Sequence, residues 1–191
     1  MAENRIDLFN DMAGDIKHLV DGENRVDDVV LHTSPTRSGI TVALATIAGG
    51  GDDDFSSSVS VALSYENDSF YASLAVDDNV KDRDVVRFVT QYFVGNLSLG
   101  VLWQSSENNQ LAAADQEDGI FGSIAYRWNN FTWKLQYGES DQKAIGKEQL
   151  TAGFDYKLGD NTRLFTYVTQ FDGDDDAEEV DHYGIGFEHR F

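Results

Sequence analysis

The sequence has no cysteine and only one proline, Pro35, among 191 residues. The missing thiols exclude disulfides, thiol catalysis and cysteine-ligated metals. Basic residues are also scarce, since 14 Lys plus Arg stand against 34 Asp plus Glu, giving a formal net charge of -20. A chain with this charge is repelled by phosphate backbones, so we expect no nucleic-acid partner.

Long apolar runs are absent as well. No stretch approaches the roughly 20 apolar residues that a membrane helix requires, and the mean hydropathy is -0.40. The strands of transmembrane barrels alternate lipid-facing and lumen-facing residues, so their hydropathy averages out and this absence excludes little. The residues after Met1 lack a basic segment followed by an apolar one, so we expect no signal peptide in the chain as given.

A period of two dominates the sequence from Arg25 onward, which is typical of β-strands. In residues 150–158, for example, apolar side chains occupy every second position and small or polar ones the positions between. This pattern predicts an all-β, single-domain chain with eleven antiparallel strands, at roughly 26–34, 39–48, 57–66, 69–77, 84–94, 96–105, 119–128, 131–138, 148–158, 161–171 and 181–191.

The predicted connections alternate in length. Short turns at 34–38, 66–68, 95–96, 129–130 and 159–161 are separated by longer acidic loops at 49–56, 77–84, 105–118, 139–148 and 172–181. Tight turns at one end and long loops at the other are typical of outer-membrane barrels. Aromatic residues near strand ends fit the interfacial girdles of such a barrel, although they equally fit the core of a soluble β-sandwich.

The end of the chain carries the first family resemblance. Residues 183–191 read Tyr-Gly-Ile-Gly-Phe-Glu-His-Arg-Phe. They resemble the terminal strand of outer-membrane β-barrels, which ends in Phe after aromatic or apolar residues at alternate positions. The resemblance implies that Tyr183, Ile185, Phe187 and Phe191 form a signal for the barrel-assembly machinery, with His189 departing from the pattern.

The beginning of the chain carries the second resemblance. Residues 7–15, 21–28 and 30–35 resemble the trimeric general porins of Gram-negative bacteria at their constriction loop and the strand after it. The matching positions are Arg25, Val26, Asp27, Val30, Ser34 and Pro35, whereas Asp28 stands in place of Asn and His32 in place of Tyr. With both ends in agreement, the resemblance covers essentially the whole chain.

This resemblance implies a transmembrane, up-and-down barrel of sixteen strands, of which the chain supplies strands six to sixteen. Eleven strands alone leave one edge unmatched in a barrel class that normally closes with an even number. We therefore expect a fragment with a constriction-loop segment at 1–24 and barrel strands at 25–191. The alternative is a smaller complete barrel in which residues 1–24 act as a plug.

Residues 6–20 predict a short amphipathic helix with an apolar stripe of Leu8, Phe9, Met12, Ile16 and Leu19. Placed as the resemblance implies, its acids Asp7, Asp11 and Asp15 face the pore and form the acidic side of the constriction. The alternative is an ordinary solvated face on a docked helix. Alternation also predicts lumen-facing basic residues, which act either in ion selectivity or in ion pairs along the wall: Arg87, Arg127, Lys134, Lys157, Arg163 and Arg190, alongside Asp155 and Glu188.

The function that these features favour is passive diffusion of ions and small hydrophilic solutes across the outer membrane. We expect no catalytic residue, no cofactor and no specific metal site, although the acidic runs 51–54 and 172–181 offer hard oxygen ligands. The alternatives are a small outer-membrane barrel hydrolase, with His182 as its base, and a soluble or surface β-sandwich that binds a partner. The expected partners are outer-membrane lipid, the barrel-assembly machinery and, at full length, two further copies in a homotrimer.

Overall fold

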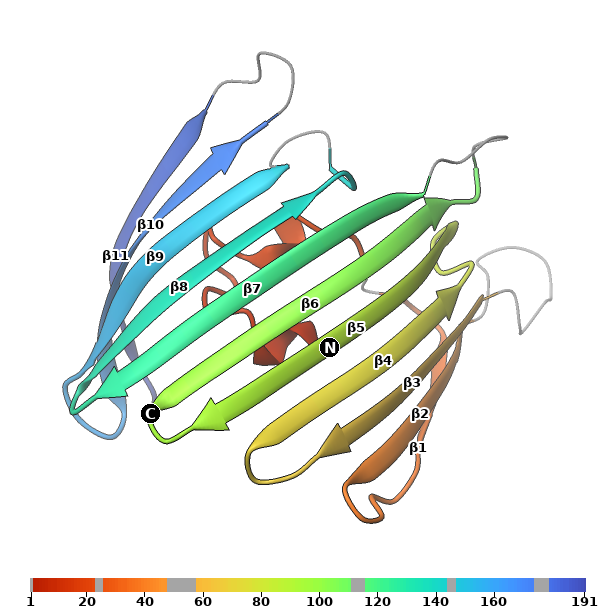
Figure 1. The fold of residues 1–191 in the computed structure, drawn as a ribbon, viewed down its shortest axis with the longest axis horizontal. Coiled ribbons are helices and arrows are strands. Elements are labelled where there is room, and N and C mark those ends of the chain that lie inside the picture. Colours follow the sequence, from red (N-terminus) through yellow and green to blue (C-terminus); the bar gives the residue numbers. More distant parts are fainter. Residues whose placement is uncertain (1, 23–25, 48–57, 111–115, 144–146, 174–178) are drawn as a thin grey trace.

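A computed structural model describes residues 2–22, 26–47, 58–110, 116–143, 147–173 and 179–191. Eleven strands form one sheet in sequence order, and every neighbouring pair is antiparallel (Figure 1). The strands are β1 (Val29–Thr33), β2 (Ile40–Ile47), β3 (Ser58–Glu66), β4 (Phe70–Asp78), β5 (Arg83–Val94), β6 (Leu97–Asn108), β7 (Glu117–Trp128), β8 (Phe131–Ser140), β9 (Glu148–Lys157), β10 (Thr162–Asp172) and β11 (Val180–His189). The prediction of eleven up-and-down strands is confirmed.

The strand bounds differ from the predicted ones mainly at the long-loop end. β6 continues to Asn108 and β7 begins at Glu117, because their ladder extends from Ser105 opposite Asp118 to Ser106 opposite Glu117. The loop between them is therefore shorter than the predicted 105–118. Polar and charged residues continue the ladder here, so the pairing extends beyond the apolar part of these strands.

The short turns all lie at one end of the sheet, the lower edge in Figure 1. Three of the five reverse the chain with residues in left-handed backbone conformations, at Ser38 and Gly39, at Gly95, and at Asn129. Such residues supply the positive φ angles that tight hairpin turns require. The opposite ends of the strands carry the longer connections, as the sequence predicted, except between β4 and β5, where the predicted loop 77–84 is reduced to residues 79–82.

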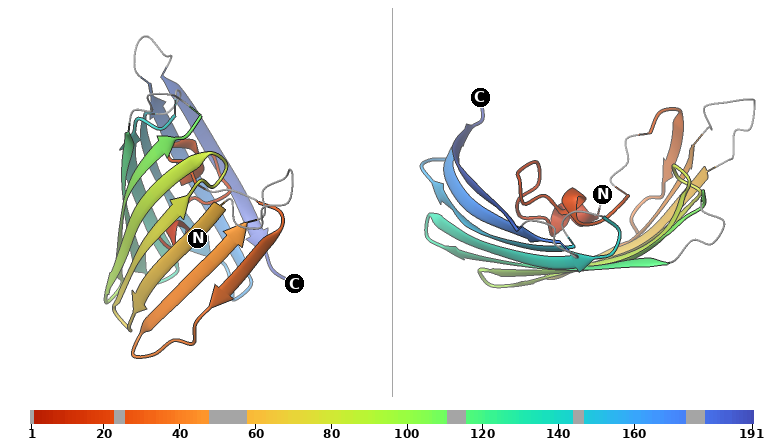
Figure 2. Two further views of the ribbon diagram at one scale, coloured as in Figure 1. Left: turned by 90° about the vertical axis from the view of Figure 1, so that its right-hand side faces the viewer. Right: turned by 90° about the horizontal axis from the view of Figure 1, so that it is seen from above.

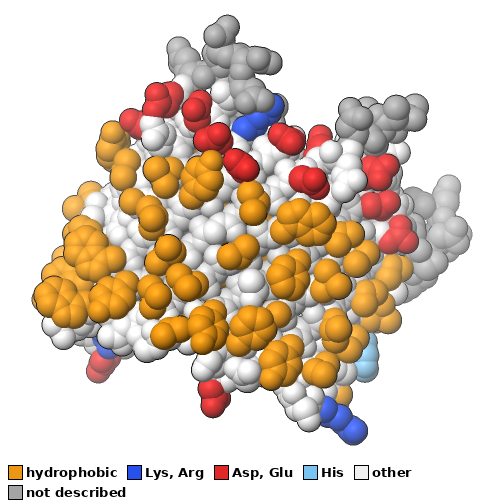
Figure 3. Space-filling view, viewed as in Figure 1, with side chains coloured by type: hydrophobic (Ala, Val, Ile, Leu, Met, Phe, Trp, Pro, Cys, Tyr) orange, Lys and Arg blue, Asp and Glu red, His pale blue; other side chains and the backbone are white. Residues whose placement is uncertain are grey.

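The sheet curves into an open trough rather than a closed cylinder (Figure 2). Among the described residues, β1 and β11 each pair with one neighbour only, so both edges of the sheet are open. The convex face exposes large apolar side chains in a broad band (Figure 3), for example Trp103, Leu135 and Leu164. The described residues contain no helix long and apolar enough to cross a membrane.

The concave face carries both polar and apolar side chains, and the N-terminal segment, residues 2–22, covers part of it (Figure 2). This segment contains two three-residue 3-10 helices, η1 (Glu3–Arg5) and η2 (Ile16–His18). Its buried apolar side chains, Ile6, Ile16, Leu19 and Val20, form one cluster with wall residues Tyr71, Val89, Leu102 and Phe121. The main apolar core of the described chain therefore lies inside the trough.

Candidate functional site

The site that the sequence singled out is the N-terminal segment together with the wall beneath it. In place of one amphipathic helix over 6–20, the structure has irregular backbone that contains only the three-residue 3-10 helix η2, while η1 precedes this range. The apolar stripe is nevertheless used, because Phe9, Ile16 and Leu19 are all buried. The helix prediction was wrong in backbone conformation and correct for three of the five apolar residues in its stripe, since Leu8 and Met12 are only partly buried.

Carboxylates of the segment explain why no continuous helix forms. Asp7 accepts hydrogen bonds from the backbone N–H groups of Phe9 (3.0 Å) and Ile16 (3.1 Å). Asp15 accepts from those of Asp11 (2.7 Å) and Lys17 (2.9 Å). Asp side chains that bind nearby N–H groups offer the backbone an alternative to helical hydrogen bonds. Asp11 also adopts a positive φ of 63°, which interrupts a right-handed helix.

The three predicted constriction acids therefore differ in their surroundings. Asp7 and Asp15 are buried, whereas Asp11 is exposed. Burial raises the pKa of Asp7 from 3.8 to about 6, although the N–H groups of Ile16 and Phe9 oppose that shift. Asp15 also forms an ion pair with Lys17 at 3.0 Å. Their role at a pore constriction stays a prediction, and only Asp11 has the exposure that direct contact with ions requires.

A row of glutamines on the wall holds the backbone of the segment, and the sequence reading missed it. Gln91 donates to the Arg5 carbonyl oxygen (2.7 Å) and Gln104 donates to that of Asp21 (2.7 Å). Gln136 accepts from Leu8 N–H (3.1 Å), and it donates to the Gly14 carbonyl oxygen, as does Gln149. A glutamine amide both donates and accepts, which suits irregular backbone. The signal in the sequence was their concave-facing positions in the strand alternation.

Gly14 sits closely against the wall where these bonds converge. A Cβ built on Gly14 would lie 2.6 Å from the Thr151 hydroxyl oxygen and 3.0 Å from that of Thr169. Only glycine allows the backbone this approach.

Arg87 of β5 anchors the start and the end of the segment. Its guanidinium forms a 2.9 Å ion pair with Glu3, donates to the Asp21 carbonyl oxygen at 2.6 Å, and donates to Gln104 at 2.5 Å. Both charged side chains are buried. Burial is the largest single influence and would raise the pKa of the Glu3 carboxyl, but the charge of Arg87 together with hydrogen bonds and other nearby positive charge holds that pKa below its ordinary value. The sequence identified Arg87 as lumen-facing but did not identify Glu3 as its partner.

Asp21 makes a second charged junction at the long-loop end of the wall. Arg83 lies 2.9 Å from the Asp21 carboxylate and 3.0 Å from that of Glu117. Lys143 also pairs with Asp21. None of these four residues was predicted as part of the site, because their meeting depends on the path of the segment across the trough.

The remaining predicted basic residues lie near the short-turn end of β7 to β11. Lys134 pairs with Asp155 at 2.8 Å, and Arg163 pairs with Asp155 and with Glu188, both at 2.7 Å. Arg190 pairs with Glu188 at 2.8 Å, and Lys157 pairs with Asp160 at 3.1 Å. Five of the six predicted basic residues thus form ion pairs along the wall. For Arg127, the described residues provide no ion-pair partner.

The predicted assembly-signal residues are exposed on or after the last strand. Tyr183, Ile185 and Phe187 alternate along β11, and Phe191 follows it. Tyr183 is opposite Val168 in the β10 ladder, and both side chains belong to the convex apolar surface. The structure thus places the aromatic pattern on the convex side of an open edge, and the signal role stays a prediction.

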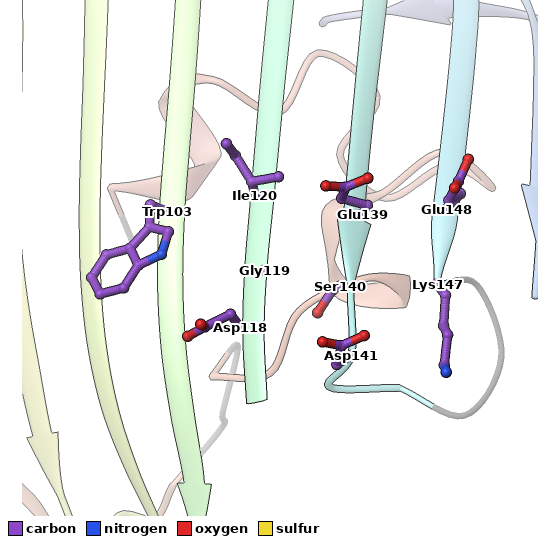
Figure 4. Close-up of a pocket in the computed structure, with 9 residues that line it drawn as sticks. All are labelled: Trp103, Asp118, Gly119, Ile120, Glu139, Ser140, Asp141, Lys147 and Glu148. Carbon is purple, nitrogen blue, oxygen red and sulfur yellow. The ribbon is translucent and has the colours of Figure 1, made fainter. Parts of the chain in front are cut away.

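The long-loop end carries an acidic hollow of about 340 Å³ over β7 to β9 (Figure 4). Four carboxylates line it, from Asp118, Glu139, Asp141 and Glu148, with Lys147 nearby. Acidic side chains also gather along the same edge in Figure 3. Such an edge attracts cations at low ionic strength.

No metal centre is found in the part of the chain that the structure describes, where no group of three or more suitable side chains meets. Of the acidic runs considered for Ca²⁺ or Mg²⁺, residues 51–54 and the central 174–178 of the second run lie outside the described residues. His182, considered as a catalytic base, packs with its ring edge-on against Phe171, 5.8 Å between centroids.

Comparisons with known proteins agree with this architecture. A family model described as Gram-negative porin matches residues 3–176. An anion-selective porin from Comamonas acidovorans superposes with a TM-score of 0.73 and 17% identity, covering 87% of this chain and 60% of that chain. An engineered mutant of a Rh. blastica porin superposes with a TM-score of 0.67 and 16% identity, covering 93% of this chain and 63% of that chain. Among curated proteins, no match was found. The chain thus spans about three-fifths of the length of these solved porins.

Proposed function

Because the chain belongs to the Gram-negative porin family and hence to the outer membrane, we propose that it forms part of a passive channel for ions and small hydrophilic solutes. The observation that carries the proposal is the difference in polarity between the two faces of the sheet. The convex face presents an apolar band to lipid (Figure 3), and the concave face carries glutamines that bind the N-terminal segment together with ion pairs such as Arg163 with Glu188. This is how a transmembrane barrel separates lipid from an aqueous lumen.

The N-terminal segment supports the channel proposal because it narrows the space inside the trough. It lies along the concave wall from β4 to β10, held by Arg87, by the glutamine row and by the apolar cluster. A pore filters solutes by its width and by the charges at its narrow point. We propose that this segment is the constriction and that the exposed Asp11 is its main acidic determinant.

The channel proposal includes no chemical step and no cofactor. In support, the matched family and fold are those of channels. The rival role for His182 as a catalytic base is tested by the same preparation, since a His182→Ala variant should conduct like the parent protein.

Planar-bilayer recording tests the channel directly. The protein, folded in detergent and added to one side of a membrane, should produce stepwise increases in current that scale with salt concentration. Asp11→Asn should reduce the preference for cations, read from the reversal potential in a salt gradient. Asp68→Asn, an exposed acid on a short turn, is the matched control and should leave the reversal potential unchanged. Folded protein that inserts and gives no steps would overturn the proposal.

We also propose that the complete protein associates as a homotrimer in lipid and is inserted by the barrel-assembly machinery. The open edges at β1 and β11 and the exposed apolar band support a need for further strands or copies. Native mass spectrometry in detergent tests the trimer. A mass corresponding to one copy only, for protein taken from outer membranes, would count against it.

A further inference from the structure

A hollow of about 540 Å³ lies at the short-turn end of the trough, between the ends of β7 to β11. Its lining comes from the turns between these strands and from concave-facing residues just above them. It is separate from the N-terminal segment, since none of its thirteen lining residues belongs to residues 2–22. It is also at the opposite end of the strands from the acidic hollow of Figure 4.

The charge balance of this hollow is opposite to that of the whole chain. Four lining residues are basic and three are acidic, whereas the chain has 14 basic and 34 acidic residues. The four basic residues are Arg127, Lys157, Arg163 and Arg190. An excess of positive charge at one mouth of an otherwise acidic protein raises the local concentration of anions.

Two of the three carboxylates in the hollow are each shared by two basic residues, and the third, from Asp160, pairs with Lys157. Asp155 forms ion pairs with both Arg163 (2.7 Å) and Lys134 (2.8 Å). Glu188 likewise forms ion pairs with both Arg163 (2.7 Å) and Arg190 (2.8 Å). These contacts fix the guanidinium of Arg163 between two strands, so part of the hollow is preorganised.

Arg127 is the residue that these carboxylates do not reach. Within the described chain its side chain has no ion pair and no hydrogen bond. Its ladder partner is Thr132, and the other neighbours in the lining include the amides of Asn129 and Asn130. The two parallel N–H groups of a guanidinium can bind two oxygens of a phosphate or a similar oxyanion at once, and neighbouring neutral amides can donate to the other oxygens.

We propose that this hollow binds a soluble phosphate-type oxyanion, with Arg127 as the principal ligand and Arg163 as a fixed neighbouring charge. The ligand is a free solute rather than a lipid headgroup because the hollow is lined by the concave face, whereas the lipid-facing band lies on the convex face. The volume exceeds that of an inorganic anion, so a small organic phosphate also fits. The binding site does not depend on whether the chain conducts.

Titration calorimetry with inorganic phosphate at pH 7.5 tests the site on protein folded in a zwitterionic detergent. We expect saturable binding that Arg127→Gln weakens about tenfold, the typical worth of one charge-assisted contact. Arg37→Gln is the matched control, because Arg37 is an exposed arginine on another short turn, outside the hollow. It should change the affinity less than twofold. Circular dichroism checks that each variant is folded.

Arg127→Lys keeps the charge and removes the fork, so it provides a second measurement should Arg127→Gln not fold. We expect it to bind phosphate more weakly than the parent protein and more tightly than the glutamine variant. Equal weakening by the Arg37 and Arg127 variants would overturn the site in favour of diffuse attraction. Undetectable phosphate binding would overturn it too, as would binding only to phosphatidylglycerol in nanodiscs.

Discussion

Two valines on the concave face show how unevenly the wall is buried. Val89 of β5 is fully buried, whereas Val29 of β1 is 41% exposed, although both line the same side of the sheet. The difference is the N-terminal segment, which covers the central strands and leaves β1 and most of β2 and β3 uncovered. Alternation in the sequence decides which face a side chain is on, and the segment decides whether that face is buried.

The same comparison indicates where the stability inside the trough is concentrated. Full burial of a Val or Leu side chain contributes about 1.5–3 kcal/mol, and in the described chain such burial gathers under the segment. We therefore expect substitutions in the covered region to cost much more than similar substitutions in the uncovered one.

The largest effect is expected from Arg87→Met. It removes the ion pair that Arg87 makes with the buried Glu3 carboxylate, and breaking a buried pair in this way costs about 3–5 kcal/mol. Urea unfolding in detergent measures the change. The double variant Glu3→Gln with Arg87→Met should recover part of the loss, whereas Arg37→Met, in the uncovered region, should cost little. Similar losses for Arg87→Met and Arg37→Met would remove the distinction between the two regions.

The second-largest effect is expected from Leu19→Ala, which should lower the free energy of unfolding by about 2–5 kcal/mol, as is typical for a buried leucine. Leu19 is fully buried and lies against Gly138 of β8. The matched control is Leu63→Ala on the convex face of β3, where Leu63 is half-exposed. Unfolding curves in the same detergent should show the smaller change for Leu63, and the reverse order would mean that the segment is not docked as described.

The free energy of unfolding is expected to change with pH by up to about 3 kcal/mol because of Asp7, whose pKa rises from 3.8 to about 6 on burial. Between these values the folded protein binds more protons than the unfolded chain, so stability falls as the pH rises through about 4 to 6. Unfolding at pH 5 and pH 7 should reveal this loss. Asp7→Asn should abolish this part of the pH dependence, and the exposed Asp68→Asn should retain it. An unchanged pH dependence in Asp7→Asn would show that another group is responsible.

The smallest effect is expected at the boundary between the regions, from Arg5→Gln. Arg5 binds both carboxylate oxygens of Glu66 in β3 at 2.8 Å, and its guanidinium lies 4.1 Å from the centre of the Tyr71 ring. Both charged side chains are largely exposed, and such pairs contribute about 0.2–1 kcal/mol. A loss above about 2 kcal/mol would mean that Arg5 ties the uncovered strands to the covered ones.

The eleven strands were predictable from the sequence because each has an apolar face of its own. Residues such as Leu150 and Phe154 mark the convex face without reference to any other strand, and turn residues such as Gly95 and Asn129 mark the reversals. Strand ends beyond the membrane, as at Asn108, were missed because their residues are polar on both faces.

The conformation of the N-terminal segment was not predictable in the same way. Its apolar spacing fits a helix, but the carboxylates of Asp7 and Asp15 bind the backbone instead, and Gln136 and Gln149 complete its hydrogen bonds. These partners lie more than a hundred residues away in the chain. A local pattern carries no information about such distant contacts, so Glu3 and Asp21 were also missed as partners of Arg87 and Arg83.

The long sequence separation between the segment and its partners also sets the order in which the parts of the molecule fold. Each strand of the sheet pairs with its neighbour in sequence, so the wall can grow hairpin by hairpin with short loop closures. The contacts of Leu8 with Gln136 and of Gly14 with Gln149 span 128 and 135 residues, and they cannot form before β8 and β9 exist. The segment precedes these strands in the sequence but reaches its place only after they have paired, so the wall is uncovered until the segment docks.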